Sequence, residues 1–548
     1  RDVLGSRGLG DVYKRQPSVY SGRSYFLLYW VAISMSKTII IIGAGLAGLS
    51  AALQAAENGC NVKLVSSLPS ERAQSVMAEG GINAALNTKD ENDSPEEHFT
   101  DTIKAACGLA DPNAVWGMTQ AAPELVHWLL KLGVKFNMSG YDDVDLRNFG
   151  GQKKKRTAFA QSDTGKQIMT AMIDAVRRKE ASGMVERFSH HSFLTLRLCG
   201  NICCGCVIRD EYSQETVELP GDAVIVATGG MHGLFGNTTG SLSNTGEVTA
   251  ELFRLGVPLA NGEMIQYHPT TVKCGGKRML ISEAARGEGG RLFAMKDGKQ
   301  WYFMEEKYPE LGNLMPRDIT AREIWKVSHE SEVFLDMTEI SEEIISNKLS
   351  GLADDCMTYL HKDIRKEPVS VLPGIHYFMG GILVDEQHRT PIQNLYAAGE
   401  CCAQYHGANR LGGNSLLGAL YGGRVAAKSA CEQADVVDLS CATQIDFPPA
   451  SQISEIKQLN KVMQETMGVV RNENTLLNGI QTVQALTGNL PLLGMAVLKS
   501  ALARKESRGA HWREDYPKSN DNDYLKTTVA RFDGKQIQIS FVPVPERR

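Results

Sequence analysis

The sequence has little excess of charge of either sign and no long apolar run. Its 548 residues carry a formal net charge of -5, and charged side chains make up 22% of the chain. So small an excess gives no reason to expect a nucleic acid or an acidic membrane surface as a partner. The apolar stretch at residues 25–33 is too short to cross a bilayer, and no cleavage site follows it. These absences favour a soluble globular protein without a direct membrane span.

The sequence also lacks internal repeats, low-complexity tracts and a disulfide framework. Twelve cysteines in so long a chain are too sparse to staple a fold. Four of them cluster between Cys199 and Cys206, but Gly200-Asn201 among them is typical of a hairpin turn. Because four thiols on one hairpin would hardly surround a single ion, we expect no metal site there.

The chain begins without methionine. Its first methionine, Met35, stands just before the first predicted strand, and residues 1–16 resemble translated adapter or vector DNA. We therefore expect residues 1–34 to be a non-native or disordered leader, with a degenerate export signal as the alternative. The length suggests roughly three to four domains.

The chain is organised around one strand, turn and helix. Thr38–Ile42 is a continuous apolar and β-branched run, which is typical of a buried parallel strand. Gly43, Gly45 and Gly48 follow at the spacing G-x-G-x-x-G, and an Ala-rich run to Asn58 predicts the helix that they open. We expect Gly43 to permit the tight turn, Gly45 to let a pyrophosphate approach the backbone, and Gly48 to let the helix pack closely.

What this unit lacks is the acid that usually ends the second strand. The predicted strand at residues 62–65 is followed by Ser66 and Ser67. The adenosine ribose must find a partner elsewhere, so the unit alone leaves NAD and FAD open.

Three later segments favour FAD. Gly80-Gly81 stands in a polar loop that suits close passage over a flat ring, a buried strand ends at Gly229-Gly230, and another ends at the acid Glu400. A large two-nucleotide cofactor lying across the sheet requires such elements in this order. No second dinucleotide unit appears, so we expect no NAD(P)H site. The residues expected to contact FAD are Gly43, Ala44, Gly45, Gly48, Ser66, Gln74, Glu79, Gly80, Gly81, Thr228, Gly229, Glu400, Ser415 and Leu416.

The remaining composition suggests an inserted domain and a helical C-terminus. Residues 35–265 and 374–436 are expected to form the two parts of a Rossmann-like FAD-binding domain, and the more charged residues 266–373 an α+β insert. Apolar residues repeat at helical spacing from residue 453, so residues 437–548 are expected to form a small helical bundle followed by a polar tail. The predicted fold class is α/β.

Charged and imidazole side chains gather where the predicted domains join. His268 opens the insert, His376 follows it, and Arg317 and Arg410 lie in polar loops. Taken singly, a histidine is usually a satisfied polar group and an arginine beside an aspartate is usually a surface pair. Two imidazoles and two guanidinium groups beside the flavin segments together predict a clamp for a dianionic substrate.

At these residues the chain resembles the flavoprotein subunit of succinate dehydrogenase and fumarate reductase. The resemblance covers residues 37–529, and motifs in a fixed order are far more specific than any one of them. The matching motifs are Ala78-Glu-Gly-Gly-Ile82, His268-Pro-Thr270, Arg286-Gly-Glu-Gly-Gly290, Pro316-Arg-Asp318, His376-Tyr-Phe-Met-Gly-Gly381, His406-Gly-Ala-Asn-Arg410 and Ser507-Arg-Gly-Ala-His511.

The resemblance implies an enzyme that interconverts fumarate and succinate by hydride transfer with FAD. Arg317 would pass a proton to one substrate carbon, and Glu283 and Arg286 would resupply it. Positive charge there also suits the carbanion that develops beside a carboxylate. The insert resembles the family's mobile capping domain, which closes over the substrate and excludes water. Four implied carboxylate-binding residues and one that caps the substrate are His268, Ser282, His376, Arg410 and Phe149.

One position departs from the resemblance. Where the family usually carries the histidine that is bonded covalently to the flavin, this chain has Gln74, which cannot make that bond. We therefore expect non-covalent FAD with a lower potential, and a bias toward fumarate reduction. Distant His98 is the alternative attachment site.

Two other functions remain open. L-aspartate oxidase is a relative with unlinked FAD and a similar site, but Leu411-Gly-Gly-Asn-Ser415 looks more like the dicarboxylate enzymes. A flavin electron carrier without substrate chemistry would not need the complete clamp.

The resemblance also implies partners. With no Fe–S ligand spacing of its own, the chain would exchange electrons with an iron–sulfur subunit and quinone, and a membrane anchor subunit would complete the assembly. The chain is then expected to be cytoplasmic, peripheral on the cytoplasmic side of the inner membrane.

Overall fold

The computed structural model describes residues 36–140, 142–435, 445, 447 and 452–548. The predicted leader, residues 1–34, lies outside the described residues, as does most of residues 437–451. A parallel sheet has the strand order β20-β10-β1-β2-β6. Its strands are Leu395–Ala397 (β20), Ala223–Val226 (β10), Thr38–Ile42 (β1), Asn61–Ser66 (β2) and Val185–Ser189 (β6).

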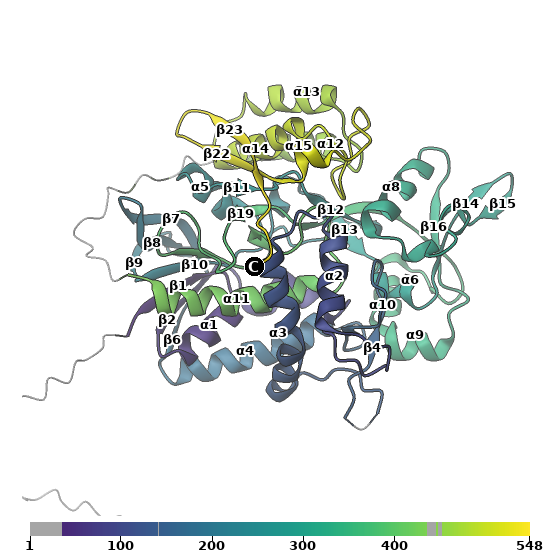
Figure 1. Ribbon diagram of the computed structural model, residues 1–548, viewed down its shortest axis with the longest axis horizontal. Coiled ribbons are helices and arrows are strands. Elements are labelled where there is room, and N and C mark those ends of the chain that lie inside the picture. Colours follow the sequence, from purple (N-terminus) through teal and green to yellow (C-terminus); the bar gives the residue numbers. More distant parts are fainter. Residues whose placement is uncertain (1–35, 141, 436–444, 446, 448–451) are drawn as a thin grey trace, which may run out of the picture. The chain divides into compact units, whose positions relative to one another are not determined.

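The sheet is covered on both faces, which explains the continuous apolar run of β1. Ile39 and Ile41 pack against α1 (Leu46–Glu57), α4 (Thr164–Ala181) and α11 (Asn414–Gln433), which lie side by side in Figure 1. Ile40 and Ile42 point to the opposite face and pack against an antiparallel meander. Alternate side chains of β1 are therefore buried in two different hydrophobic layers, one on each face of the sheet.

The meander confirms the predicted hairpin at Gly200-Asn201. Its strands are His191–Cys199 (β7), Ile202–Asp210 (β8) and Thr216–Pro220 (β9). Cys203 and Cys206 are buried in the apolar layer beneath the sheet. Within the residues that the structure describes, no three His, Cys, Asp or Glu side chains are placed to hold a metal ion.

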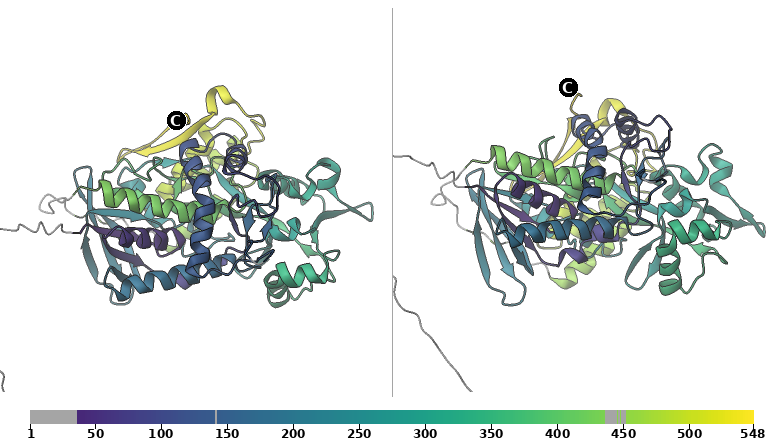
Figure 2. Two further views of the ribbon diagram at one scale, coloured as in Figure 1. Left: turned by 60° about the horizontal axis from the view of Figure 1, so that its bottom comes forward. Right: turned by 90° about the horizontal axis from the view of Figure 1, so that it is seen from below.

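The insert has its own hydrophobic core. It begins and ends on paired strands, since β12 (Ile265–Cys274) lies antiparallel to β18 (Leu372–Phe378). This pairing returns the chain to its point of departure, and the elements of the insert stay together in both views of Figure 2. The other elements are β13 (Lys277–Leu280), α6 (Glu283–Gly287), β14 (Arg291–Lys296), β15 (Lys299–Trp301), α7 (Phe303–Lys307), α8 (Arg317–Val327), β16 (Val333–Asp336), α9 (Glu342–Lys348), α10 (Ser350–Asp355) and β17 (Val369–Ser370).

Smaller elements complete the cofactor-binding half. None of the helices within the described ranges is long and apolar enough to cross a membrane. The helices are α2 (Pro95–Ala105), α3 (Pro112–Leu132) and α5 (Glu247–Arg254), and the short strands are β3 (Ile82–Asn83), β4 (Leu146–Arg147), β5 (Thr157–Ala158), β11 (Leu259–Ala260), β19 (Gly381–Leu383) and β21 (Cys402–Ala403).

The C-terminal region has the expected helices, but the predicted polar tail is wrong. The expected helices are α12 (Ile453–Thr466), α13 (Glu473–Val483) and α14 (Asn489–Ala503), and a further short helix, α15 (Asp521–Tyr524), lies in the region predicted as tail. After them, β22 (Lys526–Phe532) and β23 (Ile537–Pro543) form a hairpin that joins the sheet through β11. Burial of Val529 and Ala530 stabilises this pairing. The Asp533-Gly534 turn between alternating runs was the overlooked sequence signal.

The central sheet allows a direct test of core packing. Ile225 is fully buried between Ile41 and the helices, so Ile225→Ala should lower the free energy of unfolding by about 2–5 kcal/mol through lost contacts and a cavity. Urea titration followed by circular dichroism would measure this change. Ile453, which is 74% exposed, provides the control, since Ile453→Ala should cost less than about 0.5 kcal/mol. Equal effects of both substitutions would contradict the assigned core.

Candidate active site

One cavity of about 870 Å³ joins the glycine-rich turn to the insert. Among the predicted site residues, only Gly48 and Arg286 do not line it. The predicted residues that do are Gly43, Ala44, Gly45, Ser66, Gln74, Glu79, Gly80, Gly81, Phe149, Thr228, Gly229, His268, Ser282, Glu283, Arg317, His376, Glu400, Arg410, Ser415 and Leu416.

The three glycines of the turn differ in what they make room for. Gly43 has φ of 110°, and a Cβ there would overlap the carbonyl of Ala227. A Cβ on Gly48 would overlap the carbonyl of Gly43. Gly45, in contrast, has no neighbour closer than 3.7 Å to such a Cβ. The chain itself demands Gly43 and Gly48, whereas Gly45 leaves the backbone open to the cavity, as a close pyrophosphate requires.

The polar groups along this part of the cavity fit a nucleotide cofactor. Ser66 Oγ, at the end of β2, is buried without a hydrogen-bond partner. Glu400 Oε1 accepts a hydrogen bond from the Phe378 amide at 3.0 Å, which orients the carboxylate beside the cavity. An unpaired hydroxyl and an oriented carboxylate are suitable partners for sugar hydroxyls.

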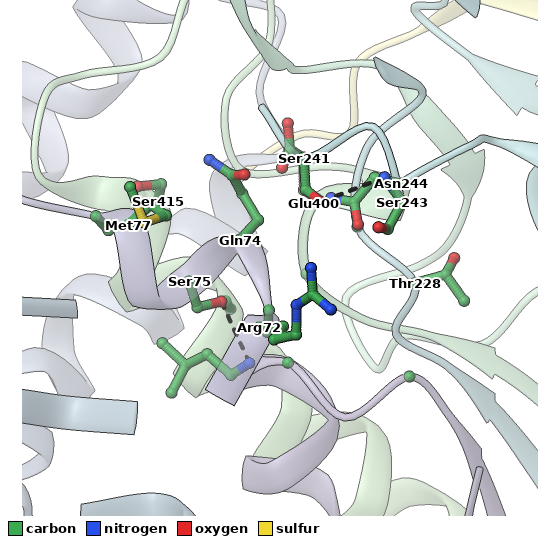
Figure 3. Close-up of a pocket in the computed structure, with 18 of the residues that line it drawn as sticks. Arg72, Gln74, Ser75, Met77, Thr228, Ser241, Ser243, Asn244, Glu400 and Ser415 are labelled. Atoms are coloured by element: carbon green, nitrogen blue, oxygen red, sulfur yellow. Dashed lines mark hydrogen bonds between the residues drawn. The ribbon is translucent and has the colours of Figure 1, made fainter. Parts of the chain in front are cut away.

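Gln74 lies in a 3-10 turn, residues 74–77, and lines the same cavity. In the view of Figure 3 its side chain extends between Ser415 on one side and Glu400 on the other. His98 is placed differently. It is buried in α2, its Nε2 lies 2.9 Å from Asn414 Oδ1, and it does not line the cavity.

A buried ion cluster stands at the insert end. Glu283 Oε2 accepts hydrogen bonds from Arg317 Nε at 2.8 Å, and its Oε1 lies 3.4 Å from Arg286 Nη2. The Gly150 amide also donates to Oε1 at 3.1 Å. Burial raises the pKa of Glu283, but the two guanidinium groups and these hydrogen bonds outweigh it and hold that pKa below its ordinary value. Glu283 is therefore an ionised link between Arg317 and Arg286.

Arg286 lies behind this link rather than at the cavity. Its Nη1 donates to the Asn313 carbonyl at 2.6 Å. Burial lowers the pKa of Arg286, and the neighbouring Glu283 carboxylate opposes that shift. The predicted group of Arg317, Glu283 and Arg286 is thus brought together as one chain of contacts from the cavity inward.

Gln266 completes the cluster, and the sequence analysis missed it. Its Oε1 accepts hydrogen bonds from Arg317 Nη1 at 3.1 Å and from Arg410 Nη2 at 3.0 Å. Its Nε2 donates to Asn409 Oδ1 and to the Arg410 carbonyl, which fixes the amide orientation. The one signal in the sequence that could have indicated it is its position two residues before His268.

Two histidines lie beside the guanidinium groups. The rings of His268 and His376 are 5.1 Å apart, because β12 and β18 pair. His376 Nδ1 is 2.8 Å from Thr239 Oγ1, and His268 Nε2 is buried without a partner. Burial first, and then the charge of Arg317, lowers the pKa of both histidines well below the ordinary value. Both imidazoles are therefore neutral near pH 7.

Arg410 gives this end of the cavity a second positive charge. Its guanidinium carbon lies 4.4 Å from the centre of the Tyr377 ring, and its Nε has no partner. Burial and the charge of Arg317 lower its pKa to about 9, so it stays protonated at pH 7. Arg317, Arg410 and Arg286 carry three positive charges against the one carboxylate of Glu283, and this excess favours a dianion in the cavity.

Phe149 lies between the Gly80-Gly81 loop and the ion cluster around Glu283. It is buried, and a Cβ on Gly80 would approach its Cζ to 2.9 Å. A Cβ on Gly412 would approach its ring and Glu283 Oε2 at 3.1 Å. Because Gly80 and Gly412 have no Cβ, the phenyl ring has room in this position.

Glu79 is the one acidic group at the cavity whose pKa is strongly raised. Burial and the nearby Asp355 carboxylate raise the pKa of Glu79 to about 8, against smaller opposing effects of Ser282 and Arg147. Its Oε2 has no hydrogen-bond partner. Glu79 is therefore mostly protonated at neutral pH, unlike Glu283.

Comparison with known families assigns both halves of the chain. The profile of the family described as FAD binding domain matches residues 38–416. The profile described as fumarate reductase flavoprotein C-term matches residues 486–547. The first match covers most of the chain and includes the glycine-rich turn and the clamp residues up to Ser415.

Individual proteins agree with these profiles. The chain is 38% identical to the succinate dehydrogenase flavoprotein subunit of Bacillus subtilis, over 93% of this chain and 98% of the relative. It is 32% identical to the 8-methylmenaquinol:fumarate reductase flavoprotein subunit of Wolinella succinogenes, over 94% and 92%. A solved variant of E. coli quinol fumarate reductase FrdA superposes with a TM-score of 0.84 at 27% identity, over 93% and 97%.

The raised pKa of Glu79 predicts a pH effect on stability. In the folded chain Glu79 keeps its proton until about pH 8, whereas its ordinary pKa is 4.5. Its stabilising contribution is therefore complete below about pH 4.5 and is lost as pH rises through about 8. Urea midpoints of the FAD-free chain across this range should fall less steeply for Glu79→Gln. The exposed Glu310→Gln is the matched control, and identical slopes in both variants would refute the assignment.

Proposed function

The chain belongs to the family of succinate dehydrogenase and fumarate reductase flavoprotein subunits, and on this basis we propose that it interconverts fumarate and succinate. It is an FAD-dependent oxidoreductase. The supporting observation is that two neutral histidines and two arginines meet at one end of a cavity whose other end is the dinucleotide-binding turn.

The residues along the cavity hold the cofactor. When bound, FAD supplies hydride exchange with the substrate carbon. Gly45 and the N-terminus of α1 bind the pyrophosphate, while Ser66 and Glu400 form hydrogen bonds with sugar hydroxyls. Gly80 and Gly81 let the flat ring pass close to the backbone, where Phe149 lies. That all the positions predicted for the cofactor except Gly48 line one cavity supports this arrangement.

The clamp residues orient the substrate. Arg410 and the two histidines donate hydrogen bonds to the carboxylates, and the Ser282 hydroxyl adds another donor at the cavity wall. Neutral imidazoles donate without adding a third and fourth positive charge to a buried site. The arginines supply the charge that a dianion needs.

Arg317 supplies the proton. It faces the cavity and is held by Glu283 and Gln266, so its guanidinium is fixed in orientation. After Arg317 gives a proton to the substrate carbon, Glu283 Oε2 is the neighbouring atom through which a proton returns. Arg286 stabilises Glu283 from the other side. Positive charge at this position also stabilises the carbanion that develops beside a substrate carboxylate.

Gln74 supports non-covalent FAD. It reaches the cavity at the position where the family usually has the bonded histidine, and an amide cannot form that link. His98 is an unsuitable substitute, because its ring is buried and bonded to Asn414 outside the cavity wall. Without the electron-withdrawing bond the flavin potential is lower, which favours fumarate reduction over succinate oxidation.

The electrons come from partner proteins. Relatives are named as the flavoprotein subunit of succinate dehydrogenase and as quinol fumarate reductase, which supports partner subunits and a quinol. From the resemblance described above we assign an iron–sulfur partner subunit, a membrane anchor subunit and quinone to this chain as well. The chain would then be peripheral on the cytoplasmic side of the inner membrane through those subunits.

Two alternatives are separated by product analysis. A chain that reoxidises its reduced flavin with fumarate and forms succinate is the proposed enzyme. Formation of iminoaspartate products from aspartate in air would indicate an L-aspartate oxidase. A carrier without substrate chemistry would form neither product, although a carrier has no need for the buried clamp.

Removing either clamp arginine should abolish most of the turnover. Arg317→Ala and Arg410→Ala should each retain FAD but lower dye-driven fumarate reduction by about 100-fold, as expected when a group that stabilises the transition state is removed. Steady-state assays with a reduced viologen dye would measure this loss. Arg365, which is exposed and paired with Asp363, is the control, and Arg365→Ala should keep full activity. Near-normal rates in both clamp variants would overturn the site.

Gln74 predicts that the flavin is bound without a covalent bond to the chain. Acid precipitation should release the flavin into the supernatant, because only reversible contacts hold it. Fumarate reduction should outrun succinate oxidation under matched conditions. The denatured chain should give no fluorescent band in a gel, and a fluorescent band would refute the non-covalent assignment. Faster succinate oxidation would refute only the directional one.

A further inference from the structure

A turn near the C-terminus reaches the clamp from behind. Residues 507–512, here called the C-terminal turn, contain the motif Ser507-Arg-Gly-Ala-His511, which the proposed chemistry leaves without a role. The turn contacts two segments far from it in sequence. One is the Arg410 loop, residues 406–410, and the other is α8, which begins with Arg317.

Main-chain hydrogen bonds join the turn to the Arg410 loop. The Ala510 amide donates to the Ala408 carbonyl at 2.9 Å, and the Ala408 amide donates to the Ala106 carbonyl at 3.0 Å. The loop is thus held from two sides at one residue. Gly509 has φ of 54°, and a Cβ there would lie 2.6 Å from the Ala408 carbonyl oxygen. The turn can therefore approach the loop only with glycine at this position.

The same turn contacts α8. The guanidinium carbon of Arg322 lies 4.0 Å from the centre of the Trp512 ring. At the start of the helix, the Asp318 carboxylate accepts a hydrogen bond from Asn409 Nδ2 at 3.1 Å, so α8 and the Arg410 loop also contact each other. Turn, loop and helix form a closed set of contacts behind the two clamp arginines.

The turn is itself held rigidly by buried charge. Arg508 donates to both Glu506 carboxylate oxygens, at 2.8 and 2.9 Å, and to the Cys107 carbonyl at 3.1 Å. The His511 Nδ1 is 2.9 Å from Arg471 Nη1. Buried ionic networks are tolerated in few geometries, because each member needs its partners. This network therefore favours a turn with a single fixed conformation over a flexible segment.

We propose that the C-terminal turn is a positioning element that sets the separation of Arg410 and Arg317. Both guanidinium groups converge on Gln266 Oε1, at 3.0 and 3.1 Å, so a small displacement of the loop or of α8 breaks that shared contact. The proposal rests on the proposed function, in which Arg410 binds a substrate carboxylate and Arg317 donates the proton.

Gly509→Ala tests the contact with the loop. The added methyl should displace Ala408, and with it Arg410, so the dissociation constant of fumarate should rise about tenfold while FAD content stays unchanged. Fumarate binding to the oxidised, FAD-loaded chain is read from the flavin absorbance. Gly534→Ala is the matched control, since Gly534 also has positive φ, 90°, but no atom lies within 4 Å of an added Cβ.

A double-mutant cycle separates positioning from general damage. In the Arg410→Ala background, Gly509→Ala should cause no further loss of fumarate affinity if it acts through Arg410. An additive loss, or unchanged affinity in the single Gly509→Ala variant, would overturn the proposal. Unchanged affinity in Arg410→Ala itself would instead overturn the proposed function, so the two failures are distinguishable.

Trp512 tests the contact with α8, and it does not depend on the Gly509 variant folding. Trp512→Ala should lower kcat about tenfold with a smaller change in fumarate affinity, because it affects the proton donor Arg317 more than the carboxylate ligand Arg410. Trp512→Phe keeps an aromatic face for Arg322 and should restore most of kcat. Equal kcat values in the unsubstituted chain, Trp512→Ala and Trp512→Phe would contradict a positioning role.

Discussion

The site depends on burying two like charges beside each other. Arg317 and Arg410 are both buried, and both donate to the single amide oxygen of Gln266. Their repulsion in a poorly polarisable interior is costly, and the Glu283 carboxylate, which contacts Arg317 at 2.6 Å, compensates part of it. The cavity therefore keeps an unbalanced positive charge that a dianionic substrate neutralises. Burial first, and then the charge of Arg317, lowers the pKa values of His268 and His376.

Holding such a cluster requires support from distant parts of the chain. The pairing of β12 with β18 brings the two histidines together across the whole length of the insert. The C-terminal turn contacts the Arg410 loop and α8. The C-terminal region therefore also contacts the two segments that carry Arg410 and Arg317. β12 and β18 form a three-stranded sheet with β13, and this pairing holds the two ends of the insert together beside the clamp.

The two ends of the cavity are built on different principles. At the glycine-rich turn the backbone itself lines the cavity, and the missing side chain of Gly45 leaves that backbone open. At the insert end, charged side chains surround the cavity. Glu79 lies on the loop that leads from the first end toward the second, and its raised pKa keeps that part of the wall largely uncharged at neutral pH. At the insert end, the Glu283 carboxylate is ionised and is paired with Arg317.

The sequence alone determined the elements whose signals are local. Thr38–Ile42, the three glycines and the helix after them were predictable, because strand periodicity and turn geometry depend on neighbouring residues. The clamp residues were predicted from their motifs, and the structure brings them to one cavity. Tertiary structure alone decided the contacts of Gln266, the pKa of Glu79, the pairing of the C-terminal hairpin with β11 and the contact of Gly509 with Ala408. The partners of a buried group are set by which distant segments pack together, and no local pattern records that packing.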